Sequence, residues 1–138
     1  MTEIVNYLNA IKLRLETNGA AFCSDRFNKE FTVQKVFRSK KEIGSEQLPM
    51  AFITRPRKVV QSNGRVEHSV YIYAGFWLVD KELALDTFME FEEMLESAVL
   101  TRVEGDIPMA ITVSDVENDE GLSHPFYFLV MHLIVKDK

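Results

Sequence analysis

The chain is 138 residues long with a mass of 15.9 kDa, and 46% of its residues are hydrophobic and 27% are charged. These proportions are typical of one globular domain and exclude a disordered or fibrous protein. The formal net charge is −5, but residues 1–65 hold 12 Lys/Arg against 6 Asp/Glu, and residues 66–138 hold 4 against 15. Halves of opposite charge suit either a nucleic-acid-binding end or a protein that binds copies of itself. An isoelectric point near 5.2 argues against DNA binding over the whole surface.

The sequence predicts neither a membrane span nor a secretory signal. No apolar run approaches the roughly 18 residues that a spanning helix requires. The N-terminal stretch MTEIVNYLNA has neither the basic region nor the apolar core of a signal peptide. Cys23 is the only cysteine, which excludes an internal disulfide and fits a reducing compartment such as the cytoplasm.

The N-terminal region predicts a helix. Thr2 can accept a hydrogen bond from an amide of the first turn, as N-cap residues do. One apolar stripe then recurs at steps of four, three and four residues: Ile4, Leu8, Ile11 and Leu15. We expect Asn18-Gly19 to end this helix, because both residues tolerate the left-handed conformation of a helix C-terminus.

Residues 20–48 have a less regular pattern. Phe31, Val33 and Phe37 share one parity, which predicts a short edge strand, although Lys35 interrupts the alternation. The polar residues 38–47 predict a surface loop.

A β-hairpin is predicted in the middle of the chain. The apolar runs 50–54 and 66–79 flank Asn63-Gly64, and both of these residues accept the positive φ of a two-residue type I′ turn. Pro56 cannot donate a backbone hydrogen bond, so the first strand should have a bulge or an edge there. The run 66–79 is apolar on both faces, which is typical of a central strand or of one that meets a partner.

The second half predicts one helix and two more strands. Asp80 should cap the helix, with Glu82 in its first turn and a buried stripe of Ala84, Phe88, Phe91, Leu95 and Ala98. Strands are expected near 109–116 and 125–135, joined by the acidic link 117–124. The sequence therefore predicts a single α+β domain over residues 1–138. Its sheet should be mixed and mostly antiparallel, with two main helices packed on one face, in the order α-β-β-α-β-β.

The sequence contains no recognisable catalytic motif. It lacks a glycine-rich phosphate loop, a nucleophile elbow and a Cys partner for Cys23. His68, His124 and His132 lie too far apart for a helical metal pair. His132 shares a strand face with Phe126, Phe128, Val130 and Ile134, so we interpret it as a core or interface residue. We therefore expect no enzymatic activity, no catalytic residue and no cofactor.

The alternating acidic residues at the start of the acidic link partly match a calcium-binding loop. Asp115, Glu117 and Asp119 alternate as the first ligands of such a loop do. Its sixth position requires Gly and its twelfth a bidentate Glu, but Glu120 and Phe126 stand there. We expect a solvated hairpin loop and no metal site.

Two charged groups are candidate interface residues. An acidic stripe follows the second helix at steps of four, four and three residues: Glu82, Asp86, Glu90 and Glu93. A basic group lies on and beside the hairpin: Arg55, Arg57, Lys58 and Arg65. The stripe is either a plain solvated face or a surface that meets the basic group of another copy. Alternatively, the basic group binds nucleic acid, with Tyr71 and Tyr73 across the ladder from residues 54–56.

The order of elements and several local strings resemble one protein family. A helix precedes Leu48-Pro49-Met50-Ala51-Phe52-Ile53, which opens the hairpin, and the long strand 69–77 leads to the helix capped by Asp80. Asp119-Glu120-Gly121-Leu122 then precedes the terminal strand. In these features the chain is similar to the tail terminator proteins of long-tailed bacteriophages, the group that includes minor tail protein U of lambdoid phages. Residues 23–48 are longer and more basic than in that pattern.

This resemblance implies a structural role in the virion tail. Members of the family assemble, typically as hexameric rings, on the last ring of the tail tube, stop its polymerisation and present a surface to the head or neck. The implied partners are other copies of the chain, the tail tube protein and a head or neck connector. The implied location is the virion, after assembly in the host cytoplasm.

Two other classes of function are consistent with the residues alone. One is a small ligand-binding or enzymatic α+β domain with a pocket between helix and sheet, lined by Phe88, Phe91, Tyr127 and His132. The other is a nucleic-acid-binding module that uses the basic hairpin. Oligomer mass distinguishes the first from a ring protein, and salt-dependent DNA binding distinguishes the second.

Overall fold

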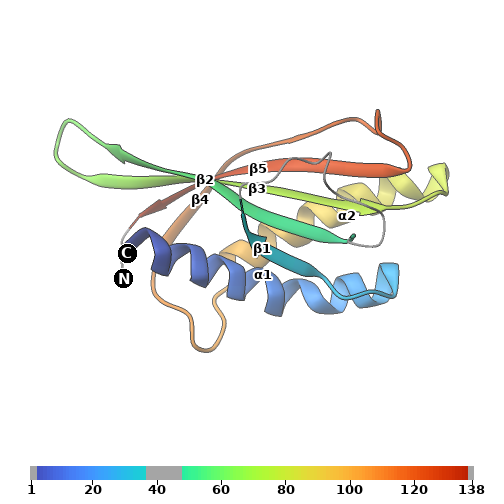
Figure 1. The fold of residues 1–138 in the computed structure, drawn as a ribbon, viewed down its shortest axis with the longest axis horizontal. Helices are drawn as coiled ribbons and strands as arrows, with labels where there is room; N and C mark the ends of the chain where they lie inside the picture. Colours follow the sequence, from blue (N-terminus) through green and yellow to red (C-terminus); the bar gives the residue numbers. More distant parts are fainter. Residues whose placement is uncertain (1–2, 37–47, 137–138) are drawn as a thin grey trace.

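The computed structural model describes residues 3–36 and 48–136. Within these ranges the elements follow in the order α1 (Glu3–Phe27), β1 (Thr32–Lys35), β2 (Met50–Val60), β3 (Val66–Trp77), α2 (Lys81–Leu100), β4 (Ala110–Asn118) and β5 (Phe126–Lys136). The strands form one sheet in the order β1-β2-β3-β5-β4, in which only the pair β1–β2 is parallel. Both helices lie on the same side of this sheet (Figure 1). The predicted fold class is confirmed.

The main core lies between the helices and the sheet. All five residues of the predicted α2 stripe are buried there, and Asp80 caps this helix by accepting from the amides of Glu82 and Leu83. Phe76 of β3 is fully buried at the centre of an aromatic cluster formed with Phe27, Phe88, Phe91 and Tyr127. Burial of these large rings supplies much of the driving force for folding.

The last strand alternates as predicted. In β5 the buried residues face the helices: Tyr127, Leu129, Met131, Leu133 and Val135. The half-buried residues lie on the opposite side of the sheet, which we call the far face: Phe126, Phe128, Val130, His132 and Ile134. β3 pairs with β2 on one edge and with β5 on the other, so it is a central strand, as its apolar sequence predicted.

The predicted end of the first helix is wrong. α1 passes through Asn18-Gly19 and continues to Phe27. The Asn18 side chain donates to the carbonyl oxygens of Ala98 and Thr101, so it caps the end of α2 and not that of its own helix. Gly19 allows the Phe31 ring to approach closely, because a Cβ at this position would lie 2.7 Å from the ring. Both residues serve tertiary contacts.

The remaining N-terminal predictions are mixed in outcome. β1 is a short edge strand that pairs with Met50–Ile53 of β2. The predicted N-cap Thr2, the residue Phe37 and the predicted loop 38–47 lie outside the described residues.

The hairpin has a three-residue loop where a two-residue type I′ turn was predicted. Gly64 has a φ of +83°, whereas Asn63 does not have a positive φ. The Gly64 amide donates to the Gln61 carbonyl, the Gln61 amide donates to the Arg65 carbonyl, and the Asn63 side chain accepts from the Arg65 amide. This pattern is a type I turn followed by a left-handed glycine. The predicted irregularity at Pro56 is confirmed, because the register shifts between Thr54 and Arg57.

Replacing Gly64 tests this loop. Gly64→Ala should lower the free energy of unfolding by about 1 kcal/mol, because a Cβ is strained at this φ although the space around it is open. Gly64→Asn is the matched control and should cost less, since Asn tolerates the left-handed conformation. Urea denaturation measures both changes. Equal losses for the two variants would show that the left-handed conformation at Gly64 does not determine the change in the free energy of unfolding.

Candidate interaction surfaces

We call the hairpin residues 55–66 the basic arm. β1 pairs only as far as Ile53, and β5 reaches only His68, so residues 59–67 form a two-stranded ribbon beyond the rest of the sheet (Figure 1). Arg57 and Lys58 lie at the base of this ribbon, where they pair with Ser69 and His68 and where β5 still borders β3. The four charged residues of the arm are Arg55, Arg57, Lys58 and Arg65, and all four are exposed. The structure therefore places Arg65 on the ribbon and the other three predicted cations at its base.

Arg55 differs from the other three cations. It lies in the bulge with a φ of +52°, and its guanidinium stands over the rings of Tyr71 and Tyr73 at 5.7 and 5.4 Å. Tyr71 pairs with Thr54 across the ladder, as expected, while Tyr73 pairs with Phe52. Cation–π contacts of this kind hold Arg55 against the far face.

His132 extends the aromatic cluster on the far face. Its ring stacks on Tyr71 with 4.5 Å between centroids, and its Nε2 is 2.5 Å from the Ser69 hydroxyl oxygen. His132 is therefore a hydrogen-bonded strand residue that lies half-buried on the far face and not in the main core, and its place in an interface stays a prediction. His68 is buried beside Tyr7 on the helix side of the sheet, and His124 lies in the link before β5. The three histidines are therefore in three separate environments.

The acidic stripe on α2 is less uniform than the sequence indicated. Glu82, Asp86 and Glu93 are exposed and form no ion pair with any other described residue. Glu90 forms an ion pair with Arg26 at the end of α1, and this hydrogen bond lowers the pKa of Glu90. We therefore correct the prediction that the whole stripe is uncompensated: Glu90 has a partner within the chain.

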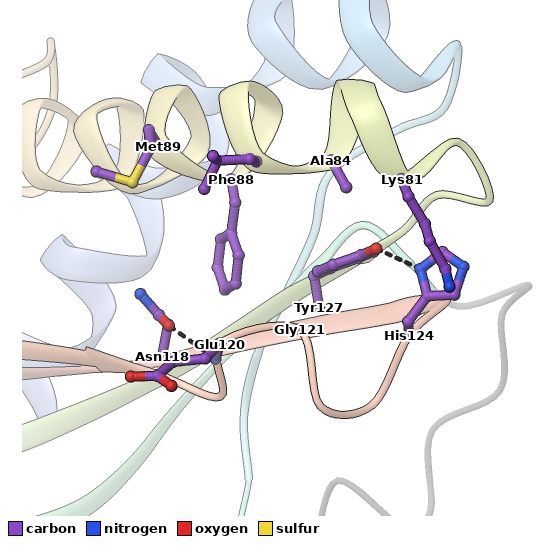
Figure 2. Close-up of a pocket in the computed structure, with 10 residues that line it drawn as sticks. Lys81, Ala84, Phe88, Met89, Asn118, Glu120, Gly121, His124 and Tyr127 are labelled. Carbon is purple, nitrogen blue, oxygen red and sulfur yellow. Dashed lines mark hydrogen bonds between the residues drawn. The ribbon is translucent and has the colours of Figure 1, made fainter.

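A surface groove lies between the start of α2 and the link that precedes β5 (Figure 2). We call it the end groove; its volume is about 480 Å³. It is lined by Lys81, Ala84, Leu85, Phe88 and Met89 of α2 and by Asn118, Glu120, Gly121, His124 and Tyr127. Figure 2 shows the hydrogen bond between the Tyr127 hydroxyl and His124 Nδ1 at one end of this groove.

The predicted ligand pocket is only partly correct. Phe88 and Tyr127 line it as expected. Phe91 is fully buried in the core, and His132 lies on the far face, so neither residue lines it. Burial, followed by the nearby Asp119 carboxylate, raises the pKa of Tyr127 above its usual range.

The side chains that were considered for metal binding or catalysis do not converge. Among residues 3–36 and 48–136, no group of three or more His, Cys, Asp or Glu side chains is arranged to hold a metal ion. Asp119 accepts a hydrogen bond from the Gly121 amide, and Asn118 accepts one from the Glu120 amide, so these side chains shape the turn. Cys23 is buried, and its burial raises the thiol pKa to about 12, which makes it a poor nucleophile.

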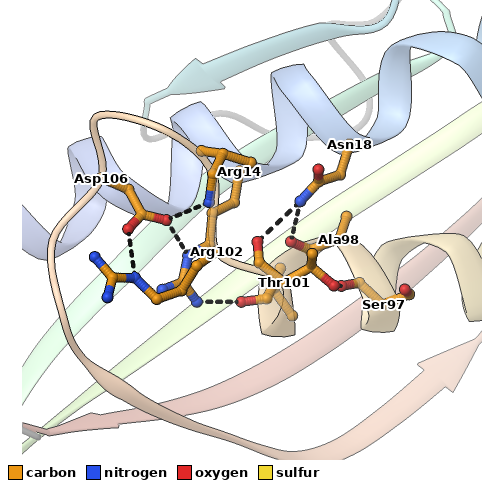
Figure 3. A network of polar contacts seen from close by, with 9 residues as sticks. Arg14, Asn18, Ser97, Ala98, Thr101, Arg102 and Asp106 are labelled. Atoms are coloured by element: carbon orange, nitrogen blue, oxygen red, sulfur yellow. Dashed lines mark hydrogen bonds and ion pairs between the residues drawn. The ribbon is translucent and has the colours of Figure 1, made fainter.

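Sequence reasoning missed a buried polar network between α1 and the end of α2 (Figure 3). Arg14 is almost fully buried and donates to Asp106 Oδ2 and to the Val99 carbonyl oxygen, each at 2.8 Å. Asp106 also accepts from the Val103 amide and from Arg102. Together with Asn18, Arg14 satisfies carbonyl groups that the end of α2 leaves unpaired. The signal in the sequence was Arg14 itself, a charged residue three positions after Ile11 and therefore on the same side of the helix as the apolar stripe.

Comparison with models of known protein families finds no match for this sequence. Comparison with curated proteins also finds no match. None of the described helices is long and apolar enough to cross a membrane.

Proposed function

We propose that this chain is a structural subunit that assembles head to tail into a ring and that the ring caps the end of a phage tail tube. In this role it stops polymerisation of the tube and offers a surface to the head or neck, first in the host cytoplasm and then in the virion. The structure supports the head-to-tail contact by separating the basic and acidic surfaces, and the ring rests on the resemblance of the sequence. The tail tube and the connector as partners rest on the resemblance of the sequence.

The observation that carries the proposal is the separation of charge along the molecule. The basic arm projects at one end of the sheet, and the exposed acidic residues Glu82 and Asp86 lie on the first turns of α2 at the other end (Figure 1). A molecule whose two ends carry opposite charge suits a heterologous contact, in which the front of one copy meets the back of the next. Heterologous contacts close into rings when the rotation between neighbours permits it.

A structural role also fits the lack of converging side chains. Among the residues that the structure describes, no group of side chains is arranged to hold a metal ion, and the contact between the Ser69 hydroxyl and His132 has no third group that would orient the imidazole, so we expect no hydrolase, transferase or redox activity. The Ser69–His132 contact is part of an aromatic stack on the far face, and no acidic side chain accepts a hydrogen bond from His132 in the described structure.

A small-molecule binding domain is the second candidate. It is favoured by the end groove, whose volume of about 480 Å³ falls within the range of ligand pockets. A ligand-binding domain of this kind can act as a monomer, so oligomer mass distinguishes it from a ring subunit.

Electron microscopy tests the proposed function directly. The purified chain should form rings, alone or when added to purified tail tubes, and tubes grown in its presence should be capped and shorter than tubes grown without it. Sedimentation equilibrium supplies the mass of the assembly. A chain that remains monomeric and neither binds tube ends nor changes tube length would contradict the proposal. Tight DNA binding that weakens steeply with salt would favour the nucleic-acid alternative.

A further inference from the structure

Exposed apolar side chains lie on the segments that form the end groove and on the neighbouring end of β3. The large hydrophobic residues that lie exposed at the end of β3, on the first turns of α2 and in the link before β5 are Trp77, Val79, Leu83, Leu85, Met89 and Leu122. Leu85 and Met89 line the groove itself and are each more than half exposed. An apolar groove with a polar rim is typical of a site of interaction.

The surroundings of the groove are acidic. Residues 77–90 and 117–127 contain seven Asp/Glu and one Lys. Glu120 and Lys81 line the groove, whereas Glu82 and Asp86 lie exposed on the first turns of α2 and do not line it. Glu82, Asp86 and Glu120 form no ion pair with any residue in the described parts of the chain. An occupant that matches this end should therefore be basic and should also carry a small apolar surface.

The basic arm has these two properties. Residues 55–66 contain four Arg/Lys and no Asp or Glu. Val60 lies next to the hairpin loop and is more than half exposed, although it is apolar. Arg57, Lys58 and Arg65 form no ion pair with any described side chain. The arm is also narrow from Val59 to Val66, because the two strands of the ribbon there lie only about 5 Å apart.

An arm cannot reach the groove of its own chain. β3 runs from Val66 at the arm to Trp77 beside the groove, and these 12 residues span roughly 35–40 Å of extended strand. Figure 1 shows the arm and the start of α2 at opposite ends of the long axis. Any contact between the two surfaces therefore joins different copies.

We propose that the basic arm of one copy docks in the end groove of the next copy. Val60 packs on Leu85 and Met89, while the cations of the arm face Glu82, Asp86 and Glu120 at the rim. The proposal rests on the proposed ring function and names the two surfaces that form the ring contact. Each copy offers one arm and one groove, so the contact repeats around the ring. The charges orient the approach and make assembly sensitive to salt, and the apolar centre supplies the buried area.

Cross-linking between two variants that each carry one added cysteine tests this contact. Val60→Cys and Met89→Cys are purified separately and mixed, and a short bifunctional thiol reagent is added. A covalent pair then forms only between different copies. We expect the mixture to give mainly the mixed dimer. The double variant Val60→Cys/Met89→Cys should give a ladder of larger products. Cys23 does not compete, because it is buried and its thiol pKa is raised to about 12.

Leu100→Cys is the matched control for Met89→Cys. Leu100 is also an apolar residue of α2 and is about equally exposed, but it lies at the other end of the helix and does not line the groove. Val60→Cys mixed with Leu100→Cys should give little mixed dimer. Equal cross-linking of the two mixtures, or none in either, would overturn the proposed contact.

Charge reversal provides an independent measurement. Arg57→Glu with Lys58→Glu should weaken association about tenfold at low salt, as expected for two exposed charge pairs that each contribute up to about 1 kcal/mol. The partner variant Glu82→Lys with Asp86→Lys should restore association in a mixture of the two. Glu93→Lys, farther along α2, is the control and should restore little of the association. Failure of the groove variant to restore association would contradict the proposal.

These outcomes separate the contact from the function. Rings on tail tubes without the expected cross-link would disprove the arm-in-groove contact and leave the proposed function standing. The expected cross-link in open chains that leave tail tubes unchanged would support the contact and contradict the capping function.

Discussion

Arg14→Ala is expected to lower the free energy of unfolding by about 3–5 kcal/mol, because it removes one partner of a buried ion pair. The Arg14 guanidinium joins α1 to the Val99 carbonyl oxygen at the end of α2 and to the Asp106 carboxylate in the connection to β4. Without it, the buried carboxylate retains only Arg102 and the Val103 amide. Chemical denaturation followed by circular dichroism measures the loss.

Arg102→Ala is the matched control for this prediction. Its guanidinium also binds Asp106, at 3.0 Å, but its side chain is 52% exposed, whereas that of Arg14 is 2% exposed. An exposed ion pair contributes about 0–1 kcal/mol, so this variant should change stability little. Similar losses for the two arginines would show that burial of the pair does not determine its energetic role.

The same network should make stability sensitive to acid. Burial opposes ionisation of Asp106, but hydrogen bonds from the Val103 amide, Arg14 and Arg102 outweigh it and lower the carboxyl pKa. An acid with a lowered pKa stabilises the folded state above its unfolded pKa of about 3.9, and this contribution is lost as the pH falls through the folded value. Asp106→Asn should therefore be less stable than the parent at neutral pH, and the difference should shrink below about pH 4. A constant difference across this range would contradict the assignment.

Phe76→Ala is expected to lower the free energy of unfolding by about 3–5 kcal/mol, a loss similar to that expected for Arg14→Ala. The Phe76 ring is fully buried between the helices and the sheet, where it contacts the rings of Phe27, Phe88, Phe91 and Tyr127. Its removal leaves a cavity that a close-packed core fills only in part. Urea denaturation should show a lower midpoint with an unchanged slope.

Trp77→Ala is the control for this substitution. Trp77 is the next residue in β3, lies on the far face and is partly exposed, so its removal should cost about 1 kcal/mol or less in the isolated chain. Equal costs at the two positions would mean that the far face is packed as tightly as the helix face.

Sequence reasoning was reliable where a signal repeats over neighbouring residues. The period of α2 identified its buried face from Ala84 to Ala98, and the alternation in β5 identified which residues face the helices. Local chemistry identified the cap at Asp80 and the bulge beside Pro56. These features depend on backbone geometry and on residues close in the chain, and therefore the sequence alone determined them.

Local reasoning was wrong where the same residue types also serve distant contacts. Asn18-Gly19 has the composition of a helix end, but Asn18 binds carbonyl groups of α2, and Gly19 makes room for Phe31. α2 lies about 80 residues farther along the chain, and pattern analysis does not show that it packs there. Helix propensity is a weak preference that such tertiary contacts override.

The candidate surfaces show the same division. The sequence alone determined that the chain has a basic and an acidic half and that α2 carries an acidic stripe. The tertiary structure decided that Arg26 neutralises Glu90, that His132 lies on the far face away from Phe88, and that Leu85 and Met89 line a groove. It also decided that the basic arm and this groove lie at opposite ends of the sheet. Charge and periodicity are properties of the chain itself, whereas pairing, separation and concavity depend on which distant segments the hydrophobic core brings together.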